Sequence, residues 1–383
     1  MFKMLKFQNF VPVRVEFGAG KLETVGNHAK AYGKKALIVT TGPFFKESGL
    51  VGRVEDYLKK AGVKSEVFLD ASPNPRSDEA DKGAEFAKST GCDIVIGLGG
   101  GSAIDTAKCI AVGVAQGEPT WPYWIGEKSI IAALPIIAIS TTSGTGSHIT
   151  PYSVITNPAT NEKPGAGADV MFPKVGIVDS ELMATVPQKV TAATGFDVLA
   201  HAIEAYTSNN ATPFSDQYAQ EAIKLVGKYL RRVVDNGSDA EARDAMALAD
   251  TYGGYAISIA VVSMCHVVAQ ATGGVCNTVH GESLAALTPS AMRHSINGRP
   301  EKYKRIGELL SGKELSSPEV SVEVVSALIN DIGMAIPLSK QGVKESDFNE
   351  IIDGSFRYMA SGLDLDPVPV TKEDIRKILQ ESF

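Results

Sequence analysis

The sequence predicts an α/β domain followed by an all-α domain, and three observations support this prediction. Short apolar runs alternate with helical segments as far as Pro187. Beyond Pro187, long stretches have helical spacing and show few strand signals. The length of 383 residues suffices for about two domains, each with its own core. We therefore predict an α/β domain at 1–187 and a helical domain at 188–383.

Short apolar runs mark the strands of the first half. One helix is expected to end near Lys60, and another is expected over 77–90. Apolar strands separated by helices indicate a parallel sheet covered on both faces. The predicted strands are 34–40, 63–69, the run from Cys92 into three glycines, 135–140 and 174–179.

Helical spacing dominates the second half. The β-branched run 257–262 is ambiguous, but the length of its segment favours a buried helix. An α/β half followed by a helical half leaves a cleft between them, which is a usual place for a ligand. The predicted helices are 190–208, 213–234, 239–271, 282–296, 301–311, 317–332 and 371–382.

Composition and charge exclude several classes of function. The net charge is −7 and no Lys/Arg run is present, so we expect no nucleic-acid partner. No stretch of about 18 apolar residues predicts a membrane span, and the N-terminus does not resemble a signal peptide. The four cysteines form no C-x-x-C pair, which fits a reduced, cytoplasmic protein.

A glycine loop follows the third predicted strand. The segment IGLGGGSAIDTAK (96–108) reads as strand, turn and a helix that begins near Ser102. The glycines allow close approach of a ligand, and the helix start offers N–H groups to a pyrophosphate. The alternative is a tight turn with Ser102 as the helix N-cap. The match to the usual dinucleotide fingerprint is weak, because no acidic residue ends a strand about 20 residues later.

A second loop, ISTTSGTGSHIT (139–150), follows the next strand and is rich in hydroxyl groups. Alone, such a loop is more often a turn. Two loops of this kind at the ends of strands of one sheet point to an extended phosphate-bearing ligand such as NAD or NADP.

Four side chains form a candidate metal site. Asp197 and His201 are four residues apart in a helical segment, so they share one face. Such a pair alone is more often a salt bridge, and Glu204 could extend the set. His266 lies in a helical run that Gly273 and Gly274 can break, which would let a later histidine, His280, return toward it.

One carboxylate and three imidazoles, with a substrate oxygen, suit Fe²⁺ or Zn²⁺. Cys265 and Cys276 flank His266, and thiolate ligation is the alternative. Buried free cysteine, however, usually acts as a small hydrophobic residue.

Four segments together resemble the iron-containing (group III) alcohol dehydrogenases. They are GGGSAIDTAK (99–108), STTSGTGS (140–147), GFDVLAHAIEAY (195–206) and HVVAQATGGVCNTVHG (266–281). The resemblance covers essentially the whole chain. It implies that residues 1–187 form a Rossmann-like, dinucleotide-binding domain and that residues 188–383 form a helical metal-binding and substrate domain, as in the dehydroquinate synthase-like architecture. NAD(P) and a metal would lie between them.

The resemblance also implies roles for individual residues. The metal ligands would be Asp197, His201, His266 and His280. The cofactor contacts would be Thr41, Asn74, Gly100, Gly101, Ser102, Thr141, Thr142, Thr150, Lys163 and Leu182.

Three positions depart from the family pattern. Gln270 stands where relatives commonly have a histidine near the nicotinamide, and a glutamine cannot titrate. His148 replaces a glutamate. Thr41 stands where NAD-specific relatives often have an aspartate that repels a 2′-phosphate, which makes NADP use plausible.

We therefore expect reversible hydride transfer between a small primary or secondary alcohol, or its aldehyde or ketone, and NAD(P). The alternative within the superfamily is glycerol or polyol-phosphate dehydrogenation, or a cyclising lyase of the dehydroquinate synthase type. No Lys/Arg cluster over 250–285 would hold a substrate phosphate. A metal-dependent hydrolase would not need the glycine loops. The family implies a homo-oligomer.

Overall fold

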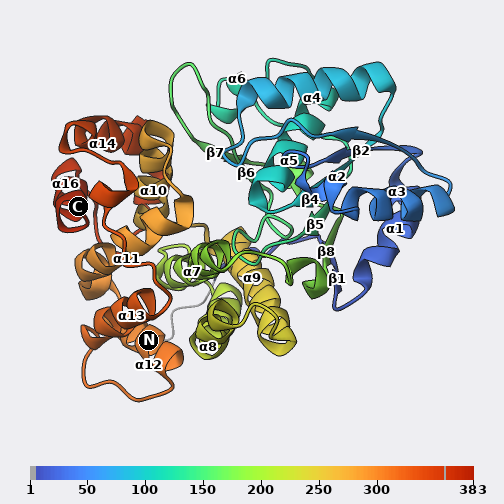
Figure 1. The fold of residues 1–383 in the computed structure, drawn as a ribbon. Coiled ribbons are helices and arrows are strands. Elements are labelled where there is room, and N and C mark those ends of the chain that lie inside the picture. Colours follow the sequence, from blue (N-terminus) through green and yellow to red (C-terminus); the bar gives the residue numbers. More distant parts are fainter. Residues whose placement is uncertain (1–5, 358) are drawn as a thin grey trace.

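The computed structural model describes residues 6–357 and 359–383, in which a sheet-containing part is followed by a helical part (Figure 1). The predicted α/β-plus-α fold class is confirmed. The boundary predicted after residue 187 falls between the last strand and the first long helix of the second half. The division into two domains itself stays a prediction.

A six-stranded parallel sheet has the strand order β1-β8-β5-β4-β2-β3. All strands that the apolar runs predicted are present. The edge strand β1 was not predicted, because its residues are only partly buried and form no apolar run. The strands are β1 (Arg14–Phe17), β2 (Lys35–Val39), β3 (Lys64–Phe68), β4 (Ile94–Gly99), β5 (Ile136–Ser140) and β8 (Val175–Val178); a separate antiparallel pair is β6 (Tyr152–Val154) and β7 (Gly165–Gly167).

Helices cover both faces of the sheet, as the apolar strands require. On β2, Ile38 belongs to the apolar cluster that contains Val54 of α3, whereas Leu37 belongs to the cluster with Ala80 of α4 and Ala107 of α5. The two clusters lie on opposite sides of the sheet (Figure 1). The helices of this part are α1 (Val25–Tyr32), α2 (Phe44–Glu47), α3 (Leu50–Lys60), α4 (Ser77–Thr90), α5 (Gly101–Gln116) and α6 (Trp121–Trp124).

The strand order reverses between β2 and β4. The chain leaves β2 toward β3 on one side, and it returns to place β4 on the other side. In open α/β sheets a crevice forms at the carboxyl ends of strands at such a switch point, and ligands bind there. Thr41 follows β2 and Gly100 follows β4, so both residues lie at this edge.

The helical part is built around α7, which is apolar on most of its circumference. It is buried from Thr191 to Thr207 except for Thr194, as expected of a central helix surrounded by others. The helices are α7 (Gln188–Thr207), α8 (Pro213–Asp235), α9 (Ala240–Ala260), α10 (Met264–Cys276), α11 (His280–Ser295), α12 (Pro300–Ser311), α13 (Val320–Asp331), α14 (Phe348–Arg357), α15 (Ala360–Leu363) and α16 (Lys372–Glu381).

The predicted single helix over 239–271 is wrong, because the chain turns sharply inside it. α9 ends at Ala260, α10 starts at Met264, and the two axes differ by 102°. Val261 makes the corner with φ of 62°, a left-handed conformation that β-branched residues rarely adopt. No glycine or proline marks this corner, so the local sequence carried no signal for it.

No single helix among the described residues is long and apolar enough to cross a membrane. α9 and α10 reach the necessary length and hydropathy only as a pair, across the 102° bend.

Candidate metal and nucleotide site

α7 brings Asp197 and His201 together, as their spacing predicts. The Nδ1 atom of His201 lies 3.6 Å from Oδ1 of Asp197 and 3.2 Å from the carbonyl oxygen of Gly144. A carbonyl oxygen only accepts hydrogen bonds, so Nδ1 of His201 carries the proton and Nε2 has its lone pair available. The loop that contains Gly144 is thereby attached to α7.

α10 presents His266 to the same point. Its Nε2 atom lies 3.2 Å from Oδ1 of Asp197, and its ring stacks on that of His201 with centroids 4.3 Å apart. Asp197, His201 and His266 each offer one oxygen or nitrogen atom, and these three atoms lie within 4.8 Å of one another. All three side chains are buried.

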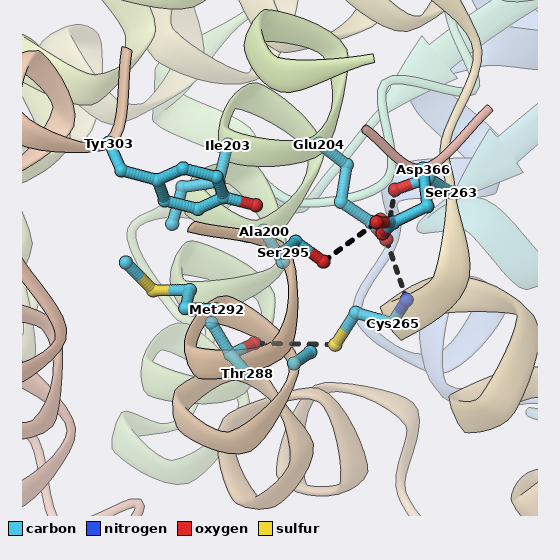
Figure 2. A pocket seen from close by; sticks show the side chains of 11 residues that line it. Ala200, Ile203, Glu204, Ser263, Cys265, Thr288, Met292, Ser295, Tyr303 and Asp366 are labelled. Carbon is cyan, nitrogen blue, oxygen red and sulfur yellow. Dashed lines mark hydrogen bonds between the residues drawn. The ribbon is translucent and has the colours of Figure 1, made fainter. Parts of the chain in front are cut away.

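Glu204 lies behind His266 and does not extend the candidate ligand set. One of its oxygens accepts from Nδ1 of His266. The other accepts from the backbone N–H groups of Cys265 and His266, at 2.7 and 3.2 Å, and from the hydroxyl of Ser263 at 3.1 Å. Figure 2 shows Glu204 with Cys265 and Ser263 beside a small cavity of about 20 Å³. Glu204 therefore holds a proton on Nδ1 of His266 and leaves Nε2 as the ring nitrogen that faces Asp197.

His280 completes the group from the first turn of α11. Its Nε2 atom lies 3.9 Å from Oδ1 of Asp197, and its ring centroid lies 5.4 Å from that of His266. The four residues that the sequence predicted as metal ligands therefore converge from the three helices α7, α10 and α11.

The glycine pair Gly273–Gly274 does not break α10, contrary to expectation. The helix continues to Cys276, and Asn277 reverses the chain with φ of 52°. The glycines allow close packing instead. A Cβ atom on Gly274 would lie 2.4 Å from the carbonyl oxygen of Asn161, and one on Gly273 would lie 3.5 Å from Nζ of Lys163.

The cysteine alternative receives no support from the geometry. The Cys265 thiol lies 3.4 Å from the hydroxyl of Thr288, and the Cys276 thiol lies 3.5 Å from a carboxylate oxygen of Asp347. Neither thiol belongs to the buried group of candidate ligands that the described residues form.

The electrostatics suit a divalent cation. Burial would raise the pKa of Asp197, but the surrounding histidines hold it at about 2, so the carboxylate is ionised. Burial lowers the pKa of His201 to about 4 and that of His280 to about 3, so both rings are neutral at pH 7. Burial also disfavours the charged form of His266, yet Glu204 and Asp197 raise its pKa to about 9, so its ring is protonated at pH 7 and a bound metal ion would replace the Nε2 proton. The carboxylates thus attract positive charge to this point, where neutral imidazoles offer lone pairs. The residues fit a metal ion.

The candidate ligands line one end of a cavity of about 340 Å³. This volume falls within the range of small-molecule sites. Five of the predicted cofactor contacts line it as well. These are Asn74, Gly101, Ser102, Thr150 and Lys163.

The glycine loop leaves a helix start open toward the cavity. α5 begins at Gly101 with Gly100 as N-cap and no side-chain cap, so Ser102 is not the N-cap. The Ser102 hydroxyl donates to the carbonyl oxygen of Pro73 instead. A Cβ atom on Gly101 would lie 2.6 Å from Cγ2 of Thr145, so only glycine fits there. The arrangement suits a pyrophosphate at the first turn of α5.

The other predicted cofactor contacts lie outside the lining of the cavity. Thr41 follows β2 and forms an isolated bridge with Asp70. Thr141 donates its backbone N–H to the carbonyl oxygen of Gly99. The remaining members of this group are Gly100 and Thr142, which are neighbours, and Leu182 in the 3-10 helix Ser180–Met183. An extended dinucleotide along the sheet edge would reach residues outside the cavity.

Asp250 of α9 ties the hydroxyl-rich loop to the helical part. Its Oδ1 accepts from the backbone N–H of Gly146 at 2.7 Å. Burial raises the pKa of Asp250 to about 7. His148 lies beside it, with Nε2 3.1 Å from the hydroxyl of Thr251. The other ring nitrogen, Nδ1, is buried 3.7 Å from Oδ2 of Asp250 and has no hydrogen-bond partner among the described residues.

Sequence reasoning missed several residues of the cavity. Val261 and Val262 line it because the chain turns between α9 and α10, and Met359 and Gly362 reach it from the C-terminal region. No local pattern in the sequence indicated that these residues would line a cavity. Asp105 was detectable, since it and Lys108 are the two charged residues of the mostly apolar helix α5.

Comparisons with known proteins show the family to which the chain is similar. The family model "Iron-containing alcohol dehydrogenase" matches residues 12–180, and the model of the C-terminal part of the Fe-containing alcohol dehydrogenase family matches residues 191–383. An NAD-dependent methanol dehydrogenase of Bacillus methanolicus is 32% identical over 380 residues, which are 98% of this chain and 99% of that protein. A 1,3-propanediol dehydrogenase of Klebsiella pneumoniae is 35% identical over 89% of this chain and 90% of that protein.

Solved structures agree as well. A mutant of an archaeal halo-thermophilic Red Sea brine pool alcohol dehydrogenase superposes with a TM-score of 0.95, at 36% identity and full coverage of both chains. A 1,3-propanediol oxidoreductase superposes with a TM-score of 0.92 at 32% identity, over 99% of this chain and 100% of that one.

Proposed function

The chain belongs to the iron-containing alcohol dehydrogenase family, and we propose that Asp197, His201, His266 and His280 hold its iron. The observation that carries this proposal is the convergence of an ionised carboxylate and three imidazoles in a buried group. Zn²⁺ suits the same ligands.

The protein is an NAD(P)-dependent alcohol dehydrogenase, which transfers a hydride reversibly between an alcohol and the nicotinamide. When bound, the metal acts as a Lewis acid on the substrate oxygen and the nicotinamide takes or gives the hydride. The chain supplies the geometry. Glu204 orients His266, and the carbonyl group of Gly144 orients His201.

The predicted contacts at the sheet edge support the binding of the dinucleotide there. The pyrophosphate would lie at the first turn of α5, near Gly101 and Ser102. Thr41, at the end of β2, would lie nearest the adenosine ribose. Gln270 lines the cavity, where we place the nicotinamide end beside the metal ligands.

The substrate is a small alcohol or its aldehyde or ketone. The cavity has about 340 Å³ for substrate and nicotinamide together, and its lining is largely apolar around the ligands. Among the described lining residues, Lys163 is the one Lys or Arg side chain, which does not favour a phosphorylated polyol. Relatives that act on methanol and 1,3-propanediol suggest short primary alcohols as the first to test.

The working environment also belongs to this proposal. Three of the four cysteines are buried and none is paired, which supports a reducing cytoplasm. We propose a homo-oligomer that acts without nucleic acid or membrane. Exposed aromatic side chains such as Phe10 and Phe44 are candidates for contacts between subunits.

The test uses protein reloaded with Fe²⁺ or Zn²⁺, with NAD and NADP against short alcohols and aldehydes, followed by nicotinamide absorbance. Turnover should require both metal and nicotinamide. His280→Ala should lose metal and turnover together, and full retention of both would refute the four-ligand proposal. A hydrolase would show no nicotinamide binding by fluorescence.

A further inference from the structure

Lys163 is a buried cation in the wall of the proposed active site. It precedes β7, is only 8% exposed and lines the cavity together with the candidate metal ligands. Its Nζ donates to Oδ1 of Asn74 at 2.8 Å. Asn74 in turn bonds to Asn277, the residue that ends α10. The amine is therefore held at a defined position between the two parts of the molecule.

Lys163 and Gln270 face the cavity close to one another. A Cβ atom on Gly273 would lie 3.5 Å from Nζ of Lys163, and one on Gly165 would lie 3.9 Å from Oε1 of Gln270. Gln270 and Gly273 are three residues apart on α10, which places them on one face about 5–6 Å apart. The Lys163 amine thus lies about one helical turn from the amide of Gln270, which cannot titrate.

Other titratable groups in the lining are less suitable for proton transfer. Besides the candidate ligands, the titratable lining residues are Asp105, Tyr152 and Lys163. The Asp105 carboxylate already accepts from the Ser147 hydroxyl at 2.6 Å and from the backbone N–H of Val154 at 2.9 Å. Burial raises the pKa of Tyr152 to about 12, far from neutral. Burial raises the pKa of Asp105 as well, but both of its carboxylate oxygens already accept hydrogen bonds, so the Lys163 amine is the better placed group for proton transfer.

We propose that Lys163 is the general base of alcohol oxidation and the general acid of carbonyl reduction in this enzyme. The proposal rests on the alcohol dehydrogenase function above. As the alcohol is oxidised, its C–H bond breaks with the hydride passing to the nicotinamide. Its O–H bond breaks with the proton passing to the neutral Lys163 amine, directly or through water, and then to solvent. Reduction reverses both transfers.

The surroundings of Lys163 support this role. Burial lowers the pKa of Lys163 to about 8, and the Asp105 carboxylate acts in the opposite direction. His280 faces it from α11 and is neutral at pH 7. The adjacent Glu162 is paired with Arg357 of α14. A base is most effective when its pKa lies near the working pH, and positioned acid–base groups contribute about 10²- to 10⁴-fold to rates.

The kinetic test compares Lys163→Arg with wild type. Arginine keeps the charge and can still donate to Asn74, but it does not lose its proton. The wild-type kcat for alcohol oxidation should rise through an inflection near pH 8. Lys163→Arg should lose this inflection and about 10²- to 10⁴-fold in kcat at saturating NAD, while metal content persists. Because Lys163 is also a predicted cofactor contact, NADH binding by fluorescence gives the concentration that saturates each variant. Lys35→Arg is the matched control, because Lys35 is the first residue of β2 and lies at the end of the strand opposite the cavity. This variant should behave as wild type.

Rescue separates proton transfer from a merely structural role. Lys163→Arg combined with Gln270→His should regain part of kcat, with a new inflection nearer pH 6.5, the ordinary histidine value. A Lys163→Arg enzyme with the wild-type rate and inflection would overturn the proposal. So would a double variant no better than Lys163→Arg, provided that it binds metal and NADH.

A direct titration needs no turnover. Trace acetylation of the metal-loaded protein at a series of pH values, with the Lys163 peptide quantified by mass spectrometry, reports the protonation of this amine. A midpoint near 8 is expected, and a midpoint above 10 would refute the proposal. Wild-type protein that binds no nicotinamide would refute the alcohol dehydrogenase function instead, so the two failures are distinguishable.

Discussion

Glu204→Gln tests whether the carboxylate behind His266 tunes the metal site. Glu204 accepts the Nδ1 proton of His266 through one oxygen and two backbone N–H groups through the other. Glutamine keeps one acceptor oxygen for the backbone groups, but its NH₂ group would face the Nδ1 proton as a second donor. Since Glu204 and Asp197 together raise the pKa of His266 to about 9, removal of the Glu204 charge would favour a neutral ring whose one proton stays on Nε2, 3.2 Å from Asp197, and not on Nδ1. Metal binding must then displace that proton.

The expected cost is that of losing such a supporting partner, about 10- to 100-fold in metal affinity. This corresponds to about 1.4 to 2.8 kcal/mol, since each factor of ten is worth about 1.4 kcal/mol. The assay is competition for Fe²⁺ or Zn²⁺ with a chromophoric chelator at pH 7. Urea unfolding of the metal-free protein shows whether the variant remains folded.

Asp366→Asn provides the matched control. Asp366 lines the same small cavity as Glu204 (Figure 2), but its partners are the Ser295 hydroxyl and the backbone N–H of Val368. Neither partner is a candidate ligand, so the metal affinity of this variant should match wild type. A folded Glu204→Gln protein that binds metal as tightly as wild type would show that Glu204 does not control the His266 tautomer.

Three further predictions concern packing, pH and cofactor choice. Gly274→Ala should lower the free energy of unfolding by about 1–3 kcal/mol, because its Cβ would lie 2.4 Å from a backbone carbonyl oxygen. Gly273→Ala should be neutral or stabilising by up to about 1 kcal/mol, because the nearest atom to its Cβ would lie 3.5 Å away. Equal urea midpoints for the two variants would contradict the close packing of Gly274 against Asn161. The folded-state pKa of Asp250, about 7, lies above its ordinary value of 3.8, so its contribution to stability is complete below pH 4 and is lost as the pH rises through 7. Asp250→Asn should therefore flatten the dependence of the free energy of unfolding on pH between pH 4 and 7. It should also raise this free energy at pH 8 by about 1–3 kcal/mol, because the asparagine amide carries no charge and can donate to Nδ1 of His148. Urea unfolding at pH 5, 7 and 9 measures this, and a profile identical to that of wild type would contradict the prediction. Thr41→Asp should raise the ratio of NADPH to NADH dissociation constants by about tenfold or more through repulsion of the 2′-phosphate, and fluorescence titrations with an unchanged ratio would place the adenosine ribose elsewhere.

Local patterns in the sequence were sufficient for much of the fold and for naming the four residues that converge in the candidate metal site. Apolar runs identify the inner strands because both sheet faces exclude water, and the edge strand β1 escaped because it has no such run. The interval from Asp197 to His201 places both on one face of a helix whatever surrounds it. The sequence did not determine how the chain runs between His266 and His280, and the helix break expected at the glycines does not occur.

What only the tertiary structure decided is how distant segments meet. The corner at Val261, held in a conformation unfavourable for valine, directs α10 toward α7 and thereby brings His266 to Asp197. The spacing of Glu204 along α7 does not reveal its partner, and the packing of α10 against α7 places its carboxylate on Nδ1 of His266. Lys163 comes to lie beside α10 because glycines there leave room for the loop that carries it. Spacing along one helix follows from its 3.6-residue turn, whereas contacts between helices depend on the packing of the whole core.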